Sequence, residues 1–367
     1  MKVALVIGPC RPGQCGVGDY TRRLRDALEA IDVDAQVISD GDWGLSKFHQ
    51  KHQLLKSTNF DIIHIQYPTA GFGRSLGPQA LSFLRPAVIT IHEASQRKLP
   101  RKLSLLPFTF WPEYLIFTDE FEEGFVHKWA PWTSRTGSAV IQVGSNIEMT
   151  NSTTPRNHRE VVHFGLIMPK KGLEEVLELG RLIKESEAPV ELTVIGQVPA
   201  GYSKYLESLM AGAGASGLPI SWFHDLNDQQ VANRLLRASI AYLPFPDGAS
   251  DRRTTLKTAL HCGLAVLTTN GPHASSALAE VVRFCSTPKD AFTVVESLIA
   301  DHAEINRLSS KSLDYAAQFS WEVIAKRHAQ IYEAVLRQRR FPACSDDSSR
   351  VGDHNRGSVS KSVINSG

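Results

Sequence analysis

Short apolar runs rich in β-branched residues recur along the chain and alternate with amphipathic stretches. The first run, Val3–Ile7, is continuous, as is typical of a strand buried on both faces of a parallel sheet. After a loop of glycine and proline, a helical pattern begins at Asp19 and repeats apolar side chains on one face at Tyr20, Leu24, Ala27, Leu28 and Ile31. Further strands are expected at residues 35–38, 62–65, 87–91, 114–117 and 139–143. Strands that alternate with helices in this way predict right-handed βαβ units in a doubly wound parallel sheet.

A second block with the same alternation follows a polar stretch, residues 149–160, which is expected to be a linker. Its first helix is expected from Leu173, and its strands at residues 161–164, 191–195, 220–223, 240–243, 265–268 and 282–285. Residues 320–338 predict a final helix with Ser320 as its N-cap. Residues 341–367 are rich in serine and poor in apolar residues, so a disordered tail is expected there.

The two blocks predict an α/β protein with two Rossmann-like doubly wound domains, residues 1–150 and 161–318, and a helix over residues 319–338. Such sheets bind ligands at the carboxyl ends of their strands. Glycine turns place helix N-termini at the same edge, which favours phosphate groups. Because two domains joined by a linker would face each other across a cleft, a nucleotide-linked substrate in that cleft is expected.

The composition narrows the function classes. With 40 Lys and Arg against 38 Asp and Glu, the net charge of +2 excludes a strongly basic nucleic-acid-binding protein, and no nucleic-acid partner is expected. The five cysteines form neither a disulfide framework nor a zinc motif. Neither a signal peptide nor an apolar run of transmembrane length is found, so a cytoplasmic protein is expected.

The first loop contains Gly13, Gly16 and Gly18, whose spacing does not match the dinucleotide fingerprint G-x-G-x-x-G, although Asp40 lies where a ribose-binding acid would. NAD binding is therefore disfavoured. The loop, with Gly16 in it, is expected either to approach a ligand in the cleft or to need glycine for its backbone turn.

Several segments, taken in order, resemble the retaining GT-B fold glycosyltransferases of family four, which use nucleotide sugars. The segments are CGVGDYTRRL at 15–24, HFGLIMPKKGLEEVLEL at 163–179, LTVIGQ at 192–197, ANRLLRASIAYLPFPDGAS at 232–250, LKTALHCGLAVLTTNG at 256–271 and FSWEVIAKRHAQIYEAVL at 319–336. The resemblance covers residues 1–338 and depends on the order and spacing of these motifs together. It implies a GT-B fold whose last helix crosses back to the first domain.

In the donor half, the resemblance implies that Gly165 forms a turn at the nucleotide and that Lys171 contacts the donor diphosphate. A lysine at a helix start adds a point charge beside amide donors, which suits a phosphate. The alternative is a solvated surface lysine. Leu166 replaces an arginine that is common in the family, so one phosphate contact is absent or supplied elsewhere.

The Glu-x7-Glu pattern of the family is absent, and Ser250 and Thr258 occupy its two positions. In the family these positions contact the transferred sugar and the nucleotide ribose, and both hydroxyls can still form hydrogen bonds to a donor. Between them, Arg252 or Arg253 could bind the diphosphate bidentately. The alternative is that both arginines are solvated or pair with the neighbouring aspartates.

On the acceptor side, His92 follows a strand at a position where the family often has a histidine facing the donor sugar. It is expected to hydrogen-bond the sugar or to polarise the reacting centre, the alternative being a buried structural histidine. Glu93 is expected to orient its ring or to touch the acceptor, and Gln66 and Tyr67 to point toward the acceptor cleft. His64, inside the preceding strand, is expected to lie in the core.

Residues 96–111, QRKLPRKLSLLPFTFW, combine four basic residues with leucine, phenylalanine and tryptophan. Such a mixture suits an element that contacts an anionic membrane surface. The alternative is a helix packed on the sheet with a basic solvated edge.

The resemblance implies a retaining glycosyltransferase of the hexosyltransferase type, which uses a nucleoside diphosphate sugar and needs no metal or other cofactor. The acceptor would be a glycan, a lipid-linked molecule or a small molecule, as in polysaccharide or glycoconjugate biosynthesis, with the enzyme in the cytoplasm or peripheral at the inner face of the membrane. Loss of both glutamates leaves two alternatives open. One is a degenerate GT-B protein that binds a sugar nucleotide or a partner without catalysis, and the other is a sugar-nucleotide epimerase.

Overall fold

The computed structural model describes residues 1–11, 15–39, 41–83, 87–95, 97–110, 112–145, 147 and 155–340. Its first six strands are β1 (Lys2–Val6), β2 (Asp34–Ile38), β3 (Ile62–Tyr67), β4 (Ala87–Ile91), β5 (Tyr114–Phe117) and β6 (Gly137–Val140). The next six are β7 (Asn157–Leu166), β8 (Glu191–Gln197), β9 (Ile220–His224), β10 (Ala238–Leu243), β11 (Ala265–Thr268) and β12 (Arg283–Phe284).

Helices alternate with these strands. They are α1 (Gly16–Glu29), α2 (Phe48–Ser57), α3 (Gly77–Ser82), α4 (Leu99–Leu103), α5 (Leu106–Phe110), α6 (Glu120–Trp129), α7 (Leu173–Ser186), α8 (Ser203–Ala215), α9 (Asp228–Arg237), α10 (Thr254–His261), α11 (Ser276–Ala279), α12 (Pro288–Ala300), α13 (His302–Ala317) and α14 (Trp321–Arg340). Short 3-10 helices are η1 (Leu45–Lys47), η2 (Ala70–Phe72) and η3 (Pro131–Arg135).

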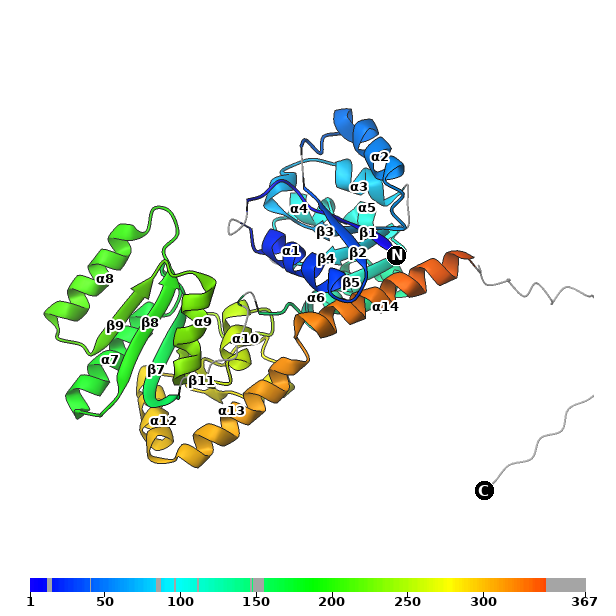
Figure 1. Cartoon of the computed structure of the whole chain (residues 1–367). Helices are drawn as coiled ribbons and strands as arrows, with labels where there is room; N and C mark the ends of the chain where they lie inside the picture. The colour runs from blue at the N-terminus through cyan, green and yellow to red at the C-terminus, as the bar shows by residue number, and fades with distance from the viewer. Residues whose placement is uncertain are drawn as a thin grey trace, which may run out of the picture.

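The described strands form two six-stranded parallel sheets, in the orders β2-β1-β3-β4-β5-β6 and β12-β11-β10-β7-β8-β9. Figure 1 shows that each sheet lies in its own lobe. The predicted fold class, two Rossmann-like doubly wound domains, is therefore confirmed.

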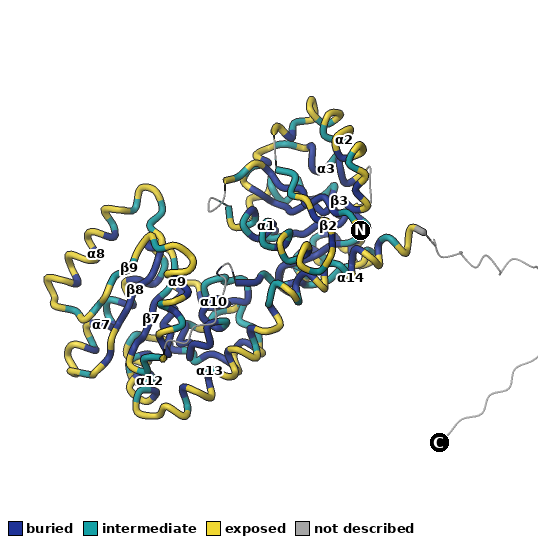
Figure 2. Tube along the Cα trace, in the orientation of Figure 1, coloured by how far each residue is buried: buried dark blue, intermediate teal, exposed yellow. Residues whose placement is uncertain are grey.

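The first sheet is covered on both faces because successive side chains of its strands are apolar. Ala4 and Val6 of β1 pack with residues of α2, α3, α5 and α6, whereas Val3 and Leu5 pack with residues of α1 and α14. This is the burial that the continuous apolar run predicted. Figure 2 shows the same contrast, with dark strands inside and exposed outer turns of the helices.

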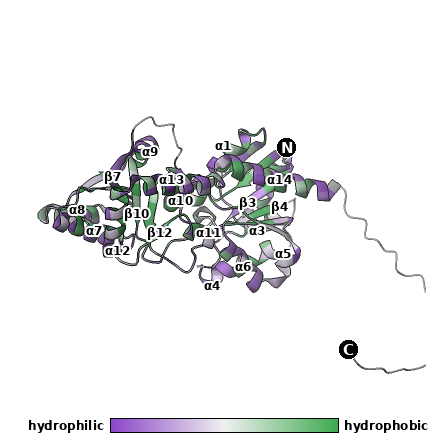
Figure 3. Cartoon of the chain, turned by 90° about the horizontal axis from the view of Figure 1, so that it is seen from below, coloured by the Kyte–Doolittle hydropathy of each residue, from purple (hydrophilic) through white to green (hydrophobic). Residues whose placement is uncertain are grey.

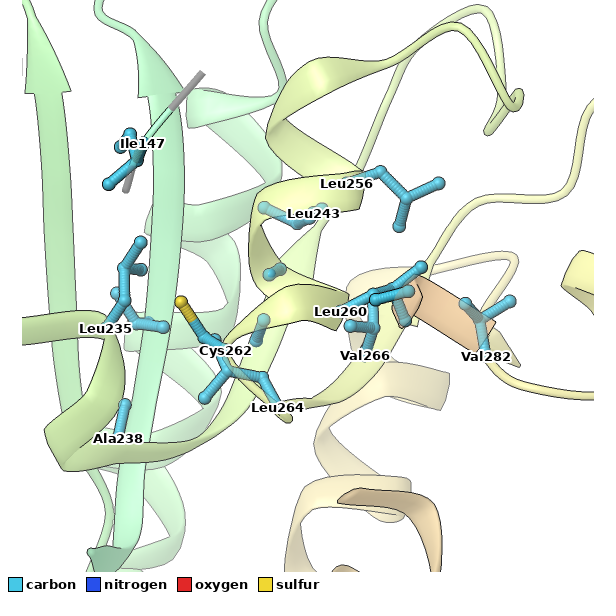
Figure 4. Packing of buried hydrophobic residues seen from close by; sticks show 14 of the residues in the cluster. Ile147, Leu235, Ala238, Leu243, Leu256, Leu260, Cys262, Leu264, Val266 and Val282 are labelled. Atoms are coloured by element: carbon cyan, nitrogen blue, oxygen red, sulfur yellow. The ribbon is translucent and has the colours of Figure 1, made fainter. Parts of the chain in front are cut away.

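The second sheet has the same two layers. Side chains of α7, α8 and α12 pack on one face and those of α9, α10 and α11 on the other, while α13 contributes to both. Figure 4 shows Leu260 of α10 beside Val266 of β11, with Leu235 of α9 in the same cluster. In Figure 3 the hydrophobic colour is concentrated on strands such as β3 and β4.

Two segments cross between the domains, and they touch each other. A Cβ at Gly144, after β6, would lie 3.0 Å from the carbonyl oxygen of Phe319, before α14. Helix α14 then packs on α1 in the first domain, as predicted, and Ser320 Oγ accepts the backbone N–H of Val323 at 3.3 Å as its cap. Both crossing segments are therefore in contact and connect the domains at one place.

Lys257 of α10 lies beside these two segments and is buried. Its ammonium donates to Gln142 Oε1 at 2.8 Å and to the Val143 carbonyl at 2.9 Å, and it lies 3.9 Å from the ring centre of Phe319. Burial lowers the pKa of Lys257 to about 7. One side chain of the second domain thus holds both crossing segments.

Some sequence boundaries shift. The helix predicted from Asp19 begins at Gly16, and the expected linker is wrong over residues 157–160, because they form the polar outer half of β7. Residues 149–154 of that linker, the predicted tail at 341–367, Gly13 and Asp40 lie outside the described residues. No helix in the described part of the chain is both long and apolar enough to cross a membrane.

Candidate functional site

A cleft of about 740 Å³ lies between the two domains. Its walls are the start of α1, the segments after β3 and β4, the end of β7 and the segment from β10 into α10. These are carboxyl ends of parallel strands, where the topology predicts a ligand. Eight residues that the sequence singled out line this cleft: Gly16, His92, Glu93, Gly165, Lys171, Ser250, Arg252 and Arg253.

Glycines shape the second-domain wall around Lys171. A Cβ at Gly165 would meet only His163 Nε2, at 3.8 Å, so this position leaves open space on the cleft side. Gly172, with φ of +83°, precedes α7, and a Cβ there would lie 1.9 Å from the Pro244 carbonyl oxygen. Only glycine fits such an approach, and it holds Lys171 at the N-terminus of α7.

Lys171 has no hydrogen bond and no ion pair to any residue in the described ranges. It is partly exposed and lies in the cleft wall. The first N–H groups of a helix attract anions. A lysine beside them without a carboxylate partner is suited to a phosphate.

Arg253 lies on the same wall, just before α10. Its guanidinium pairs with Asp247, donates to the Gly248 carbonyl at 3.0 Å, and lies 4.1 Å from the ring centre of Phe245. Asp247 is 77% exposed, so solvent screens this ion pair. The pairing with a neighbouring aspartate that the sequence left as an alternative is therefore present, and it is of the weak, exposed kind.

Arg252 points instead to the first domain. Its Nε lies 3.1 Å from Asp119 Oδ2 and its Nη1 2.9 Å from Glu122 Oε1, at the start of α6. The nearby Asp251 accepts a hydrogen bond from Tyr315 at 2.5 Å. For Arg252 the alternative pairing with Asp247 or Asp251 is therefore wrong, because its ion pairs are with Asp119 and Glu122 of the first domain.

Glu122 is completely buried and connects Arg252 to the acceptor-side wall. One of its carboxylate oxygens accepts the backbone N–H groups of Ala94 and Ser95 at 2.8 and 3.0 Å, and the other accepts the Ser95 hydroxyl at 2.5 Å. These bonds fix the segment that follows His92 and Glu93. Nothing in the sequence marks Glu122 for this role, because it lies in an acidic helix that reads as solvent-exposed.

His92 is a neutral base in the cleft. Its Nε2–H donates to Gln66 Oε1 at 2.8 Å, and its ring lies edge-on to Tyr20 with centroids 5.1 Å apart. Burial, with a smaller contribution from His328, lowers the pKa of His92 to about 3. Nδ1 therefore carries a lone pair at neutral pH and can accept a hydrogen bond from a hydroxyl.

Gln66 lies behind His92 rather than in the cleft. It is fully buried, and its amide nitrogen lies 3.0 Å from His64 Nε2. His64 in turn contacts Tyr332 of α14 at 2.6 Å and Thr90 at 2.6 Å. His64 is thus a core residue, as predicted, and the prediction that Gln66 lines the acceptor cleft is wrong, since Gln66 orients the His92 ring.

Two other expected contacts are also wrong. Tyr67 is 1% exposed, and its hydroxyl lies 2.6 Å from Ser104 Oγ, because side chains alternate along β3 and this one enters the core under α5. Thr258 is buried in α10 and bonds Ser145 Oγ at 3.0 Å, away from the cleft. Ser250 does line the cleft.

Glu93 pairs with Arg97 at 2.5 Å, and no hydrogen bond between Glu93 and the His92 ring occurs in the described residues. The ring-orienting role expected of Glu93 therefore belongs to Gln66. Arg97 and Arg101 also line the cleft, and the guanidinium of Arg101 donates to the Gly73 carbonyl. The sequence placed both arginines in a basic segment without assigning them to the cleft.

The segment 96–111 has features of both interpretations, an element that contacts a membrane and a helix packed on the sheet. Leu105 and Phe108 are buried against the sheet, whereas Leu99, Leu103 and Phe110 are 65%, 50% and 52% exposed. Gln96 and Trp111 lie outside the described residues. The described residues contain no group of three or more His, Cys, Asp or Glu arranged to hold a metal ion.

Comparisons with known proteins bear on the fold. No family model and no curated protein matches the sequence. Among solved structures, sucrose-phosphate synthase from Thermosynechococcus elongatus aligns with 92% of this chain and 99% of its own, at 15% identity and a TM-score of 0.68. HepE of Anabaena, in complex with UDP and glucose, aligns with 91% of this chain and 100% of its own, at 15% identity and a TM-score of 0.64.

An α-glucosyltransferase in complex with UDP and a 13-mer DNA aligns with 91% of this chain and 99% of its own, at 12% identity and a TM-score of 0.61. At such identities the similarity shows the fold, and it extends over nearly the whole of each chain. The two sheets, the cleft between them and the returning helix α14 are therefore those of the GT-B fold.

Proposed function

We propose that the protein transfers a hexose from a nucleoside diphosphate sugar to an acceptor hydroxyl, with retention of the anomeric configuration and without a required metal. The observation that carries the proposal is Lys171, a lysine without a partner in the described residues, at the N-terminus of α7 in the cleft of a GT-B fold. UDP-glucose is the first donor to test, because HepE was solved with UDP-glucose at 15% identity to this chain.

On the donor side, the second domain would stabilise the departing diphosphate. Lys171 supplies a positive charge at the start of α7, and Thr254 and Thr255 begin α10 in the same cleft. Arg253 can exchange its exposed partner Asp247 for a phosphate oxygen. Preorganised charges of this kind lower the barrier where negative charge develops on the leaving group.

On the first-domain side, neutral His92 would accept a hydrogen bond from a sugar hydroxyl through Nδ1 while Gln66 holds its ring. Ser250 would give a hydroxyl contact to the transferred sugar where the family has a carboxylate. Glu93, with its partner Arg97, would contact the acceptor. The enzyme would then act mainly by positioning the acceptor hydroxyl against the donor carbon.

The missing carboxylates favour one alternative, a GT-B protein that binds a sugar nucleotide without catalysis. Position 250 is a serine, and Thr258 at the second position does not reach the cleft. An epimerase would need acid and base groups placed for proton transfer.

The exposed Leu99, Leu103 and Phe110, beside basic residues of α4, are suited to contact with an anionic membrane. In that case the enzyme would work in the cytoplasm at the inner face of the membrane, on a lipid-linked acceptor. Sedimentation with anionic vesicles tests this part, and equal sedimentation of native protein and Leu99→Ser would contradict it.

The main experiment incubates purified protein with UDP-glucose and other nucleotide sugars, with EDTA present, and follows free nucleotide and the anomeric NMR signal of the product. We expect transfer or slow hydrolysis with retention. Lys171→Ala should lower kcat/KM by the factor that corresponds to a loss of about 1.5–3 kcal/mol of transition-state stabilisation, the contribution of a charge-assisted hydrogen bond. The control Lys326→Ala, an exposed position on α14, should leave it unchanged.

Binding without turnover would support the non-catalytic alternative, and an epimerised donor would support the epimerase. A folded Lys171→Ala protein with native kinetics would exclude Lys171 from the donor site.

A further inference from the structure

The positive charges in the cleft outnumber the negative ones. Five basic side chains line it, Arg97, Arg101, Lys171, Arg252 and Arg253, against two acidic ones, Glu93 and Asp247. A nucleoside diphosphate sugar carries one negative charge on each of its two phosphates. Asp119 and Glu122 also pair with Arg252, so the five cations face four carboxylates, and the ion pairs rather than the number of charges show where an anion can bind.

The ion pairs show which of these charges are uncompensated. Arg97 pairs with Glu93, Arg252 with Asp119 and Glu122, and Arg253 with Asp247. In the described part of the chain, Lys171 and Arg101 have no carboxylate within 4.0 Å.

The two uncompensated cations belong to opposite domains. Lys171 lies at the start of α7 in the second domain, whereas Arg101 lies on α4 in the first. In the proposed function Lys171 binds the donor diphosphate, whereas Arg101 lies on the first-domain wall, where the acceptor is expected.

The sequence did not show that Arg101 lies in the cleft, because only some of the neighbouring basic residues face it. Arg97 and Arg101 are four residues apart and both line the cleft, whereas Lys98 and Lys102 do not. Arg97 lies before α4, which begins at Leu99, and Arg101 lies within the helix. Lys102 lies 4.6 Å from the ring centre of Phe125, and Lys98 is exposed. Two of the four basic residues of this segment therefore belong to the cleft and two do not.

We infer that Arg101, supported by Arg97, binds an anionic group on the acceptor, a phosphate monoester or a carboxylate. The assignment of this anionic group to an acceptor rests on the proposed function, whereas the anion site itself does not. The guanidinium already donates one N–H to the Gly73 carbonyl, which fixes the side chain against the loop after β3. Its remaining N–H groups can bind an oxyanion in the fork geometry of arginine.

The test measures binding by calorimetry at one ionic strength, because salt screens such contacts. The first probe is UDP alone. The other probes are glucose 6-phosphate, glucose and inorganic phosphate, each titrated with and without saturating UDP. The proteins are native, Arg101→Gln, Lys171→Gln and the matched control Lys98→Gln. Glutamine keeps side-chain N–H donors but is uncharged and shorter than arginine, so an effect from loss of the Gly73 contact is distinguished by the binding of uncharged glucose.

We expect the native protein to bind glucose 6-phosphate at least about tenfold more tightly than glucose, as one charge-assisted bond allows. Arg101→Gln should remove this preference while changing the Kd of glucose and of UDP by less than about twofold. Lys171→Gln should weaken the binding of UDP and keep the preference for glucose 6-phosphate over glucose. Lys98→Gln should match the native protein.

Equal binding of glucose and glucose 6-phosphate to the native protein overturns the inference, as does an Arg101→Gln protein with the native preference. Weaker binding of glucose and its phosphate alike in Arg101→Gln also overturns it, because that result shows a structural role of the loop contact. If no nucleotide binds but Arg101-dependent phosphate binding remains, the proposed function fails and the anion site stands.

The anion could come from a soluble molecule or from a lipid headgroup. A final comparison adds vesicles of phosphatidylcholine with and without phosphatidic acid. Binding that needs phosphatidic acid and is lost in Arg101→Gln assigns the headgroup as source. Binding of glucose 6-phosphate with no response to the vesicles assigns a soluble acceptor.

Discussion

Removal of Arg252 should loosen the contact between the two domains. Its guanidinium lies 3.1 Å from Asp119 Oδ2 and 2.9 Å from Glu122 Oε1, and its side chain is 19% exposed while that of Glu122 is fully buried. Arg252→Ala therefore leaves two carboxylates at the interface without their cation. Burial already raises the pKa of Asp119, and loss of the arginine should raise it further.

The expected loss of stability depends on the hydrogen bonds that Glu122 keeps in the variant. Breaking a buried ion pair by removing one partner costs about 3–5 kcal/mol. Glu122 keeps three hydrogen bonds, from Ala94, Ser95 and the Ser95 hydroxyl, so the lower end of the range, about 3 kcal/mol, is expected. For a chain of 367 residues that unfolds as one unit, that corresponds to a fall in Tm of about 4 °C.

The assay is calorimetric unfolding, with small-angle scattering to detect a wider separation of the domains. The matched control is Arg253→Ala in the same loop, whose partner Asp247 is 77% exposed, so its loss should cost under about 1 kcal/mol. Adding Glu122→Gln to Arg252→Ala should recover part of the loss, because the uncompensated charge is then removed. An Arg252→Ala protein with native Tm and native scattering would refute the idea that this ion pair joins the domains.

Two further predictions concern the donor site and acid stability. Arg253→Ala should weaken donor binding by about 1.5 kcal/mol and Ser250→Ala by about 0.5–1.5 kcal/mol, since a charge-assisted contact outweighs a neutral one; a titration in which only Ser250→Ala weakens binding would contradict this order. The buried imidazoles of His64, His92 and His328 have lowered pKa values, near 3 for His92 and 4 for His328, so the unfolded chain binds more protons below pH 6.5. Stability should therefore be full above pH 6.5 and fall by up to about 1.4 kcal/mol per pH unit for each imidazole as the pH drops toward 4; unfolding curves that are unchanged between pH 7 and pH 4.5 would disprove it.

The fold could be predicted because apolar strands and amphipathic helices alternate repeatedly along the chain. Continuous apolar strands such as Val3–Ile7 demand burial on both faces, and only flanking helices provide it. The boundary at β7 was less predictable, because Asn157–Glu160 are polar and join the sheet only through pairing with neighbouring strands.

The site could be predicted most directly where a residue ends or follows a strand or precedes a helix. His92, Gly165 and Lys171 are of this kind, and the topology of parallel sheets brings them to one cleft. Tyr67 also ends a strand, but its side chain points to the other face of the sheet. The partner of Arg252 could not be found, because Glu122 lies 130 residues away in another domain.

The most direct test of the central claim is thermal unfolding of the native and Lys171→Ala proteins with UDP-, GDP-, ADP- and TDP-glucose. Ligand at about 100 times its Kd stabilises the folded state by about 2.7 kcal/mol. The account predicts that at least one of these nucleotide sugars raises the Tm of the native protein and that the increase is much smaller with Lys171→Ala. If none of them changes the Tm of the native protein, or if both proteins respond equally, the cleft at Lys171 is not a nucleotide-sugar site.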